Sequence, residues 1–362
     1  MKQCLAAVLA SVFALLSCEL AQAQQSSRFC GKIPGTSTFA GAGCLARSSY
    51  PALNSPVNPL SYGADPTGAT NSASAFRQAV SSGHDVHVIC PNAAPCTYMI
   101  SDASTRVPVL ISTNVNIQCD ANVTLYNPDH DTKYTGMLWF FGVTGGGVQG
   151  CNMKGANNGS GPLPLDTNQA NHLILVQESS NLLFEGNIFG NTWANSALYF
   201  GTANTGPGVT NSTVQYNTFT ANPLYGAAIV SGGSDTIKNN LMIDSETGVE
   251  ANNKSNNALA MSGHIFISQN IAVYTNGGCE AAGNSGCNYG IGFTAGGSVD
   301  NFTRGAYPYY ATNTVSGNYC TGSGVQHAII RDTWNRYVSP PPTYSNNILG
   351  PGCTCDSGAG SC

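Results

Sequence analysis

Short apolar runs alternate with a phrase centred on asparagine along the second half of the chain. The phrases lie at Gly186–Phe189, Tyr216–Phe219, Asn239–Leu241, Gln269–Ile271 and Gly317–Tyr319. The apolar runs that follow them are Ala197–Phe200, Ala227–Val230, Gly248–Ala251, Gly290–Phe293 and Ala328–Ile330. The asparagines at 187, 217, 239, 270 and 318 are 30, 22, 31 and 48 residues apart. A constant core with spacers of variable length is typical of stacked coils, so the pattern predicts an all-β solenoid, a parallel β-helix.

Alternation within the apolar runs predicts which residues face the core. Aligning the apolar residues gives one inward stack of Leu198, Ala228, Val249, Ile291 and Ile329, and a second of Phe200, Val230, Ala251 and Phe293. The residues between them then face outward, because side chains alternate along a strand: Tyr199, Ile229, Glu250, Gly292 and Ile330. The asparagines fall at corresponding turns, so we expect their amides to hydrogen-bond from coil to coil as scaffold.

One segment carries a helix signal. Ala73–Val80 combines small and apolar residues at helical spacing, and Ser72 precedes it as the expected N-cap. A helix at this place would cover the first coil, which otherwise leaves apolar side chains and strand edges exposed.

The segment from Tyr62 to Val80 resembles the opening of the pectate-lyase-like superfamily, where a Tyr-Gly-Ala, a Gly-x-Thr-Asp-type turn and an Ala-Phe/Ile-x-x-Ala helix precede the first strand. In this chain the turn reads Gly68-Ala-Thr-Asn71. The resemblance covers roughly residues 56–350 and implies a right-handed parallel β-helix with an N-terminal capping helix. It also implies strands at Val86–Cys90, Tyr98–Ile100, Val115–Cys119, Leu138–Phe141 and Val148–Cys151. Lyases, hydrolases, epimerases and phage tailspikes share this fold, so the resemblance leaves the reaction open.

The composition supports a turn-rich β protein and limits the partners. Only 9% of residues are charged, against about a quarter in average proteins. The net charge is −5 without any basic block, so nucleic acid and anionic membrane surfaces are not expected as partners. Nothing in the sequence decides the oligomeric state.

The N-terminus has the pattern of an export signal. A signal peptide is predicted at residues 1–23 from three features: Lys2, an apolar run from Leu5 to Leu16, and the small residues around Ala23. The apolar run is too short to span a membrane, and no later segment could do so; lipid attachment at Cys18 is the alternative. We therefore expect a secreted protein, extracellular or periplasmic. Residues 24–57 would form an N-terminal extension or cap, 58–350 the β-helix, and 351–362 a cysteine-rich tail.

Export makes disulfides the expected state of the cysteines. Outside the signal region these are Cys30, Cys44, Cys90, Cys96, Cys119, Cys151, Cys279, Cys287, Cys320, Cys353, Cys355 and Cys362. The close pairs 30/44, 90/96 and 279/287 would each pin a local loop, and the last three would tie down the tail. The full connectivity does not follow from the sequence. No zinc-type spacing is present, so no metal site is predicted.

Three carboxylates within seven residues, Asp244, Glu246 and Glu250, are unusual in a chain so poor in charge, and Lys254 follows closely. A two-carboxylate hydrolase needs its acids about 5–9.5 Å apart. Glu246 and Glu250 would lie about 13 Å apart along an extended strand at roughly 3.3 Å per residue. That distance is too long for a hydrolase pair, but all three carboxylates are candidate catalytic residues, with Glu250 as the central one. The alternative is a solvated turn with a surface strand residue.

A polysaccharide lyase needs a group that neutralises a uronate carboxylate and a base that removes the proton at C5. Arg331, His327, His264 and Lys254 are the candidates, although Arg331 could instead pair with Asp332. The chain lacks the Asn-Thr-Asp, Asp-Asp and Gly-His-Gly motifs of the polygalacturonases that the fold resembles. It also lacks the clustered aspartates of calcium-dependent pectate lyases. No cofactor is evident, and calcium has no support.

Aromatic residues suggest a sugar-binding surface. Tyr307, Tyr309, Tyr310 and Trp334 lie in or near long spacers, and Tyr199 faces outward in the predicted alignment. Exposed rings beside polar groups suit sugar faces, although such rings also pack loops onto a scaffold. The sequence thus favours a secreted enzyme that cleaves a polysaccharide on the side of the β-helix, by β-elimination rather than hydrolysis. The alternatives are a glycoside hydrolase and a non-catalytic glycan-binding or cell-surface protein.

Overall fold

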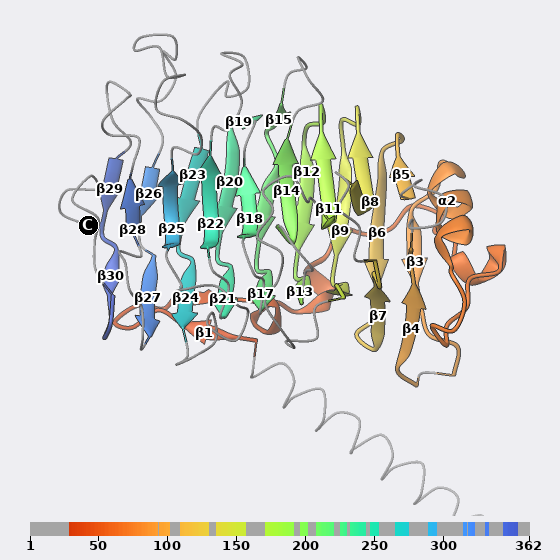
Figure 1. Ribbon diagram of the computed structural model, residues 1–362, viewed down its shortest axis with the longest axis horizontal. Helices are drawn as coiled ribbons and strands as arrows, with labels where there is room; N and C mark the ends of the chain where they lie inside the picture. The colour runs from red at the N-terminus through yellow and green to blue at the C-terminus, as the bar shows by residue number, and fades with distance from the viewer. Residues whose placement is uncertain are drawn as a thin grey trace, which may run out of the picture.

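The computed structural model describes residues 29–92, 94–101, 109–129, 135–156, 171–191, 196–201, 208–220, 225–229, 232–243, 247–252, 265–274, 289–294, 314–316, 318–322, 330–332 and 343–353. Three long parallel sheets run side by side along the molecule, with the helix α2 (Ala73–Ser81) at one end (Figure 1). Each turn of the solenoid contributes one strand to each sheet, except the last described turn, which contributes only two strands. This arrangement is a right-handed parallel β-helix, as predicted.

The first sheet is the β3–β29 sheet. Its strands are β3 (Val86–Val88), β6 (Val115–Cys119), β9 (Gly146–Gln149), β12 (Leu182–Glu185), β16 (Thr213–Gln215), β20 (Asp235–Lys238), β23 (Ile265–Ser268), β26 (Thr314–Ser316) and β29 (Thr343–Ser345). Two further short strands, β15 (Val209–Thr210) and β19 (Gly232–Gly233), pair in parallel with each other. In sequence they directly precede β16 and β20 of this sheet.

The second sheet is the β4–β30 sheet. Its strands are β4 (Cys96–Met99), β7 (Val123–Tyr126), β10 (Asn152–Lys154), β13 (Ile188–Gly190), β17 (Thr218–Thr220), β21 (Leu241–Ile243), β24 (Ile271–Tyr274), β27 (Tyr319–Gly322) and β30 (Ile348–Leu349).

The third sheet is the β5–β28 sheet. Its strands are β5 (Val109–Ile111), β8 (Thr135–Phe141), β11 (Asn171–Gln177), β14 (Leu198–Gly201), β18 (Tyr225–Ile229), β22 (Thr247–Asn252), β25 (Tyr289–Thr294) and β28 (Ile330–Asp332).

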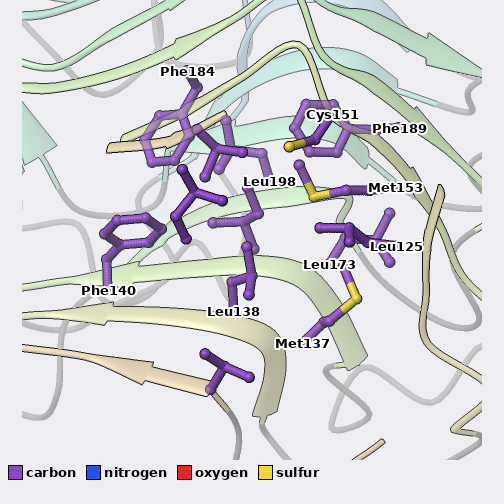
Figure 2. Packing of buried hydrophobic residues seen from close by; sticks show 14 of the residues in the cluster. Leu125, Met137, Leu138, Phe140, Cys151, Met153, Leu173, Phe184, Phe189 and Leu198 are labelled. Carbon is purple, nitrogen blue, oxygen red and sulfur yellow. The ribbon is translucent and has the colours of Figure 1, made fainter. Parts of the chain in front are cut away.

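Apolar side chains from the three sheets fill the interior of the solenoid (Figure 2). The Phe184 ring lies 5.6 Å from that of Phe140 and 5.7 Å from that of Phe200, measured between centroids. Phe189 and Phe219 stack in parallel at 5.0 Å on adjacent coils. Burying such a ring stabilises the fold by about 1.5–3 kcal/mol, so each coil is held mainly by the coils above and below it.

The asparagines form a continuous hydrogen-bonded ladder at the corner between the β3–β29 and β4–β30 sheets. Asn187 donates its backbone N–H and its side-chain Nδ2 to Oδ1 of Asn217, both at 3.0 Å. The same pair of bonds links each later member to the next, through Asn217, Asn240, Asn270, Asn318 and Asn347. These side chains satisfy buried backbone groups, so the scaffold role predicted for them is confirmed.

The ladder corrects one detail of the predicted repeat. Its member in the third phrase is Asn240, whereas the sequence alignment used Asn239. Asn239 occupies the preceding position, where the backbone takes a left-handed conformation with φ of 54°. Tyr216 and Gln269 have the same conformation one position before their ladder asparagines. Because Asn239 and Asn240 are adjacent, the sequence alone does not show which of the two belongs to the ladder.

The helix α2 covers the first coil, as predicted. Phe76 is fully buried and meets the ring of Tyr98 edge-on at 5.8 Å. Ser72 holds the N-cap position, but its hydroxyl makes no cap hydrogen bond and accepts instead from the Asp65 backbone N–H at 2.9 Å. The Asn71 side chain supplies the cap by accepting from the Ala73 N–H at 3.0 Å.

The N-terminal segment lies along the side of the solenoid rather than over its end. Residues 29–57, here called the N-terminal strap, include the short antiparallel strands β1 (Gly31–Lys32) and β2 (Phe39–Ala40), and the 3₁₀ turns η1 (Ala42–Cys44) and η2 (Arg47–Ser49). A further turn, η3 (Pro59–Tyr62), leads to α2. Figure 1 shows the strap running beneath β24, β21 and β17 toward the helical end.

Disulfides close three loops of the described chain. Cys30–Cys44 and Cys90–Cys96 are the predicted close pairs, and both are confirmed. Cys119–Cys151 joins two successive coils, a pairing that the sequence left open. Cys353 is also disulfide-bonded. Cys320 lies in β27, while Cys279, Cys287, Cys355 and Cys362 lie outside the described residues.

Candidate functional site

The β5–β28 sheet differs from the other two in the connections that flank it. Each strand of the β3–β29 sheet from β9 onward is joined to the following strand of the β4–β30 sheet by two residues, such as Gly186 and Asn187. The connections that enter or leave the β5–β28 sheet vary widely; residues 155–170, 253–264, 275–288 and 295–313 are the longer ones. Variable connections around a regular scaffold are where binding residues concentrate, so this sheet is the candidate functional face.

One row of residues crosses this sheet from coil to coil. The register pairs Leu110 with Trp139, then Leu175, Tyr199, Ala228, Glu250, Gly292 and Arg331 in order. In β14, the neighbours Leu198 and Phe200 are buried in the core while Tyr199 is partly exposed. The row, called here the lateral row, therefore lies on the outward side of the strand at Tyr199, which confirms the outward position predicted for this residue.

The register also corrects the predicted alignment of two coils. Leu198 pairs with Ala227 rather than Ala228, and Ile291 pairs with Ile330 rather than Ile329. Runs of consecutive apolar residues fit either parity, so the sequence alone does not fix the register there. The correction moves Arg331, instead of Ile330, into the row of Tyr199 and Glu250.

Aromatic residues occupy the described N-terminal part of this face. The Tyr199 ring stacks on the buried His172 imidazole, with centroids 4.4 Å apart and planes 23° apart. His172 Nδ1 lies 3.2 Å from the Ser196 carbonyl oxygen. Trp139 meets Phe141 edge-on at 6.0 Å, and its Nε1 is buried without a hydrogen-bond partner among the described residues.

The sequence analysis did not identify three residues of this face as candidate site residues: Trp139, Phe141 and His172. Trp139 and Phe141 lie within the predicted strand Leu138–Phe141, where alternation with the core residues Leu138 and Phe140 could have identified them. His172 gave no such signal, because it precedes two consecutive buried residues, Leu173 and Ile174, that break the alternation.

The structure brings two of the predicted catalytic residues into one row. Glu250 in β22 and Arg331 in β28 are each in register with Gly292 of β25, which separates them by two strand spacings, about 10 Å. The position between them in the register is held by a glycine, Gly292.

The other predicted site residues cannot be assigned a position. Asp244, Glu246, Lys254, His264, Tyr307, Tyr309, Tyr310, His327 and Trp334 lie outside the described residues, and their roles stay predictions. Within the described ranges, no group of three or more His, Cys, Asp or Glu side chains could hold a metal ion. None of the helices described there is long and apolar enough to cross a membrane.

A cavity of about 230 Å³ lies elsewhere, between the N-terminal strap and the two-residue turns. Its lining includes Arg47, Tyr50 and Gly186. The Arg47 guanidinium donates to the carbonyl oxygens of Cys119 and Gly150, and burial raises the pKa of the Tyr50 hydroxyl. Arg47 thus ties the strap to the coils, and the cavity lacks the row of aromatic and charged positions found on the β5–β28 sheet.

Comparison with known proteins gives the fold. No protein-family model matches the chain, and no curated protein matches its sequence. Among solved structures, PfbA, a surface adhesin of Streptococcus pneumoniae, is similar with a TM-score of 0.55 and 12% identity, over 83% of this chain and 80% of that one. The tailspike of E. coli bacteriophage HK620, solved in complex with a pentasaccharide, has a TM-score of 0.52 and 13% identity, over 82% of this chain.

The chain spans 57% of the length of the tailspike. At these identities the likeness establishes a shared right-handed β-helix and nothing finer. The right-handed parallel β-helix that the sequence resemblance implied is therefore confirmed.

Proposed function

We propose that the protein is a secreted, carbohydrate-active enzyme that binds an acidic polysaccharide along the lateral row and cleaves it by β-elimination. The observation that carries the proposal is the register of the β5–β28 sheet, which aligns Trp139 and Tyr199 with Glu250, Gly292 and Arg331. Three disulfides support an oxidising compartment. The expected signal peptide lies outside the described residues.

The two charged positions suit the two requirements of elimination. A guanidinium binds a carboxylate through two parallel hydrogen bonds, so Arg331 would hold and neutralise the uronate carboxylate. Glu250 would remove the proton from C5. The C5–H electron pair forms the C4=C5 double bond, the C4–O bond breaks, and the departing sugar oxygen takes up a proton from water while the C5 proton stays on Glu250. Gly292 between them leaves room for a sugar ring close to the backbone.

Hydrolysis has less support on this face. A glycoside hydrolase of the common type uses two carboxylates about 5–9.5 Å apart. Glu250 is the one acidic residue of the lateral row, whose eight positions all fall within described strands. The PfbA and tailspike likenesses do not choose between the two reactions, because they establish the fold alone.

The test is to incubate the mature protein with a panel of neutral and acidic polysaccharides. New reducing ends and the ultraviolet absorbance of the unsaturated product are measured together. We expect both signals with a uronate-containing polysaccharide, and a loss of about 10²–10⁴-fold in rate for Glu250→Gln, the range for removing a general base. Arg331→Ala should lose activity on the same scale, whereas Lys154→Ala, a cation of the β4–β30 sheet, should retain it.

The other outcomes decide between the alternatives. Reducing ends without unsaturated product would mean hydrolysis and would overturn the elimination. Binding without cleavage across the panel would mean a glycan-binding protein. Full activity in Glu250→Gln would remove the lateral row from the chemistry.

A further inference from the structure

The lateral row alternates between two kinds of residue. Trp139, Tyr199, Glu250 and Arg331 stand at every second coil, and Leu175, Ala228 and Gly292 stand at the coils between them. Large aromatic or charged side chains thus recur at a period of two strand spacings, with aliphatic residues or glycine between.

This period corresponds to a fixed length. Adjacent strands lie about 4.8 Å apart, so two spacings are about 10 Å. A disaccharide unit of an extended, β-linked polysaccharide has a similar length. A sugar chain laid along the row would therefore advance by one disaccharide for every two coils, so that one repeat lies between Arg331 and Glu250 and the next between Glu250 and Tyr199.

The exposure of the aromatic residues follows the same period of two strand spacings. Trp139 and Tyr199 are partly exposed, whereas Leu175 between them has no exposed surface. A ligand that binds on this face can therefore contact the rings of Trp139 and Tyr199 but not the side chain of Leu175. Aromatic rings pack against the C–H faces of sugars, so these two positions favour one sugar face at intervals of about 10 Å.

Building on the proposed function, we infer that the substrate is an extended polysaccharide with a disaccharide repeat, containing one uronic acid per repeat, and that it binds one repeat per two coils. The uronate of one repeat lies at Arg331 and the bond to be cleaved lies over Gly292. Tyr199 contacts the adjacent repeat on the side of Glu250, and Trp139 contacts the repeat beyond it.

The test measures binding by calorimetry to the cleavage-deficient Glu250→Gln protein. The probes are hyaluronan and chondroitin oligosaccharides of four to eight sugars, including odd-numbered lengths prepared by removing a terminal sugar. We expect affinity to rise in steps of two sugars, each step about three- to tenfold, the contribution of one aromatic contact.

Variants in the Glu250→Gln background assign the steps. Trp139→Ala should abolish the gain for the longest oligosaccharides and leave shorter ones unchanged, whereas Tyr199→Ala should already weaken the shorter ones. Tyr126→Ala, a partly exposed tyrosine of the β4–β30 sheet, is the control and should change neither.

The outcomes separate this inference from the proposed function. A gain with every added sugar, or an equal loss at all lengths in Trp139→Ala, would overturn the two-coil repeat even if the panel shows cleavage. Stepwise binding without cleavage by the unmodified protein would keep the repeat and overturn the enzyme. Cleavage of a homopolymer of uronic acids alone, with no binding of these probes, would overturn the substrate class.

Discussion

At the scale of single residues, the asparagines of the ladder serve as structure. Asn217 illustrates this, because its amide donates to Asn240 Oδ1 and to the Phe184 carbonyl oxygen while its own oxygen accepts from Asn187. Such a residue has no bonding capacity left for a ligand. Function is therefore expected at the few charged and aromatic positions that the scaffold does not use.

Glu185 is a buried acid that belongs to the scaffold. It is 6% exposed and lies between Gln149 and Gln215 in the register of the β3–β29 sheet. Gln215 Nε2 donates to Glu185 Oε1, and Gln149 Oε1 is buried without a hydrogen-bond partner among the described residues. Burial raises the pKa of Glu185, against the opposing effects of the Gln215 hydrogen bond and the Lys238 charge. A neutral carboxyl group could donate to Gln149, which an ionised one could not.

We predict a pH-dependent loss of stability that Glu185→Gln removes. Because the folded-state pKa is raised, the stabilisation is complete below the ordinary glutamate pKa and is lost as the pH rises through the raised value. Glutamine can make the same two hydrogen bonds without titrating. Chemical denaturation across acid to neutral pH should show an unfolding free energy that falls with pH in the unmodified protein and less steeply in Glu185→Gln.

Glu185→Ala provides the comparison. It should share the flatter pH dependence and unfold more easily than Glu185→Gln at every pH, since it also loses both hydrogen bonds. Identical slopes in the unmodified protein and in Glu185→Gln would contradict the assignment of a neutral Glu185. All three proteins keep Arg47 and Tyr50 of the strap unchanged.

At the scale of elements, the N-terminal strap acts as a clamp across the coils. Its Ile33 and Ala40 pack against Leu241 and Ile271 on the outward side of the β4–β30 sheet. Gly41 donates its N–H to the Asn239 carbonyl oxygen at 2.9 Å, and Asn239 returns a bond to Phe39. The strap thus covers apolar side chains that would otherwise face water.

Gly41→Ala should release the strap. Gly41 has φ of 107°, and an added Cβ would lie 2.2 Å from the Phe29 carbonyl oxygen and 2.9 Å from Leu241 Cβ. Limited proteolysis should cut the variant within residues 29–50 much faster than the unmodified protein. Exposing Leu241 and Ile271 should also increase binding of a hydrophobic dye, because each loses about 1.5–3 kcal/mol of burial.

Gly35→Ala is the matched control within the strap. Gly35 also has a positive φ, of 74°, but an added Cβ meets nothing within 4 Å. Only the backbone strain of about 1–2 kcal/mol applies there. Equal proteolysis of the two variants would mean that strain, rather than the contact with Phe29 and Leu241, holds the strap in place.

The elements also show what the sequence could and could not predict. The period of the apolar runs determined the fold, because a stacked coil needs an inward apolar residue at each level. The register of β18 and β28 was not determined, since Ala227–Val230 and Ala328–Ile330 are apolar at consecutive positions. The placement of Arg331 in the lateral row depends on that register and therefore required the structure.

At the scale of the whole molecule, the three sheets have different roles. The β3–β29 and β4–β30 sheets meet at the asparagine ladder and carry the strap, while the β5–β28 sheet carries the lateral row between connections of variable length. The sequence indicated that Glu250 and Tyr199 belong to one row, and the register places them in that row two strands apart, with Ala228 between them. It could not indicate His172 or the alternation over two coils, because both depend on pairing between distant segments.

The most direct test of the account is a crystal structure of the Glu250→Gln protein with a hexasaccharide of the polysaccharide that the unmodified protein cleaves. The account predicts a sugar chain extended along the lateral row, with a uronate carboxylate paired to Arg331, a ring over Gly292 and the chain continuing across Tyr199 toward Trp139. A sugar chain bound on the β4–β30 sheet or in the cavity beside Arg47 and Tyr50, with the lateral row empty, would contradict it.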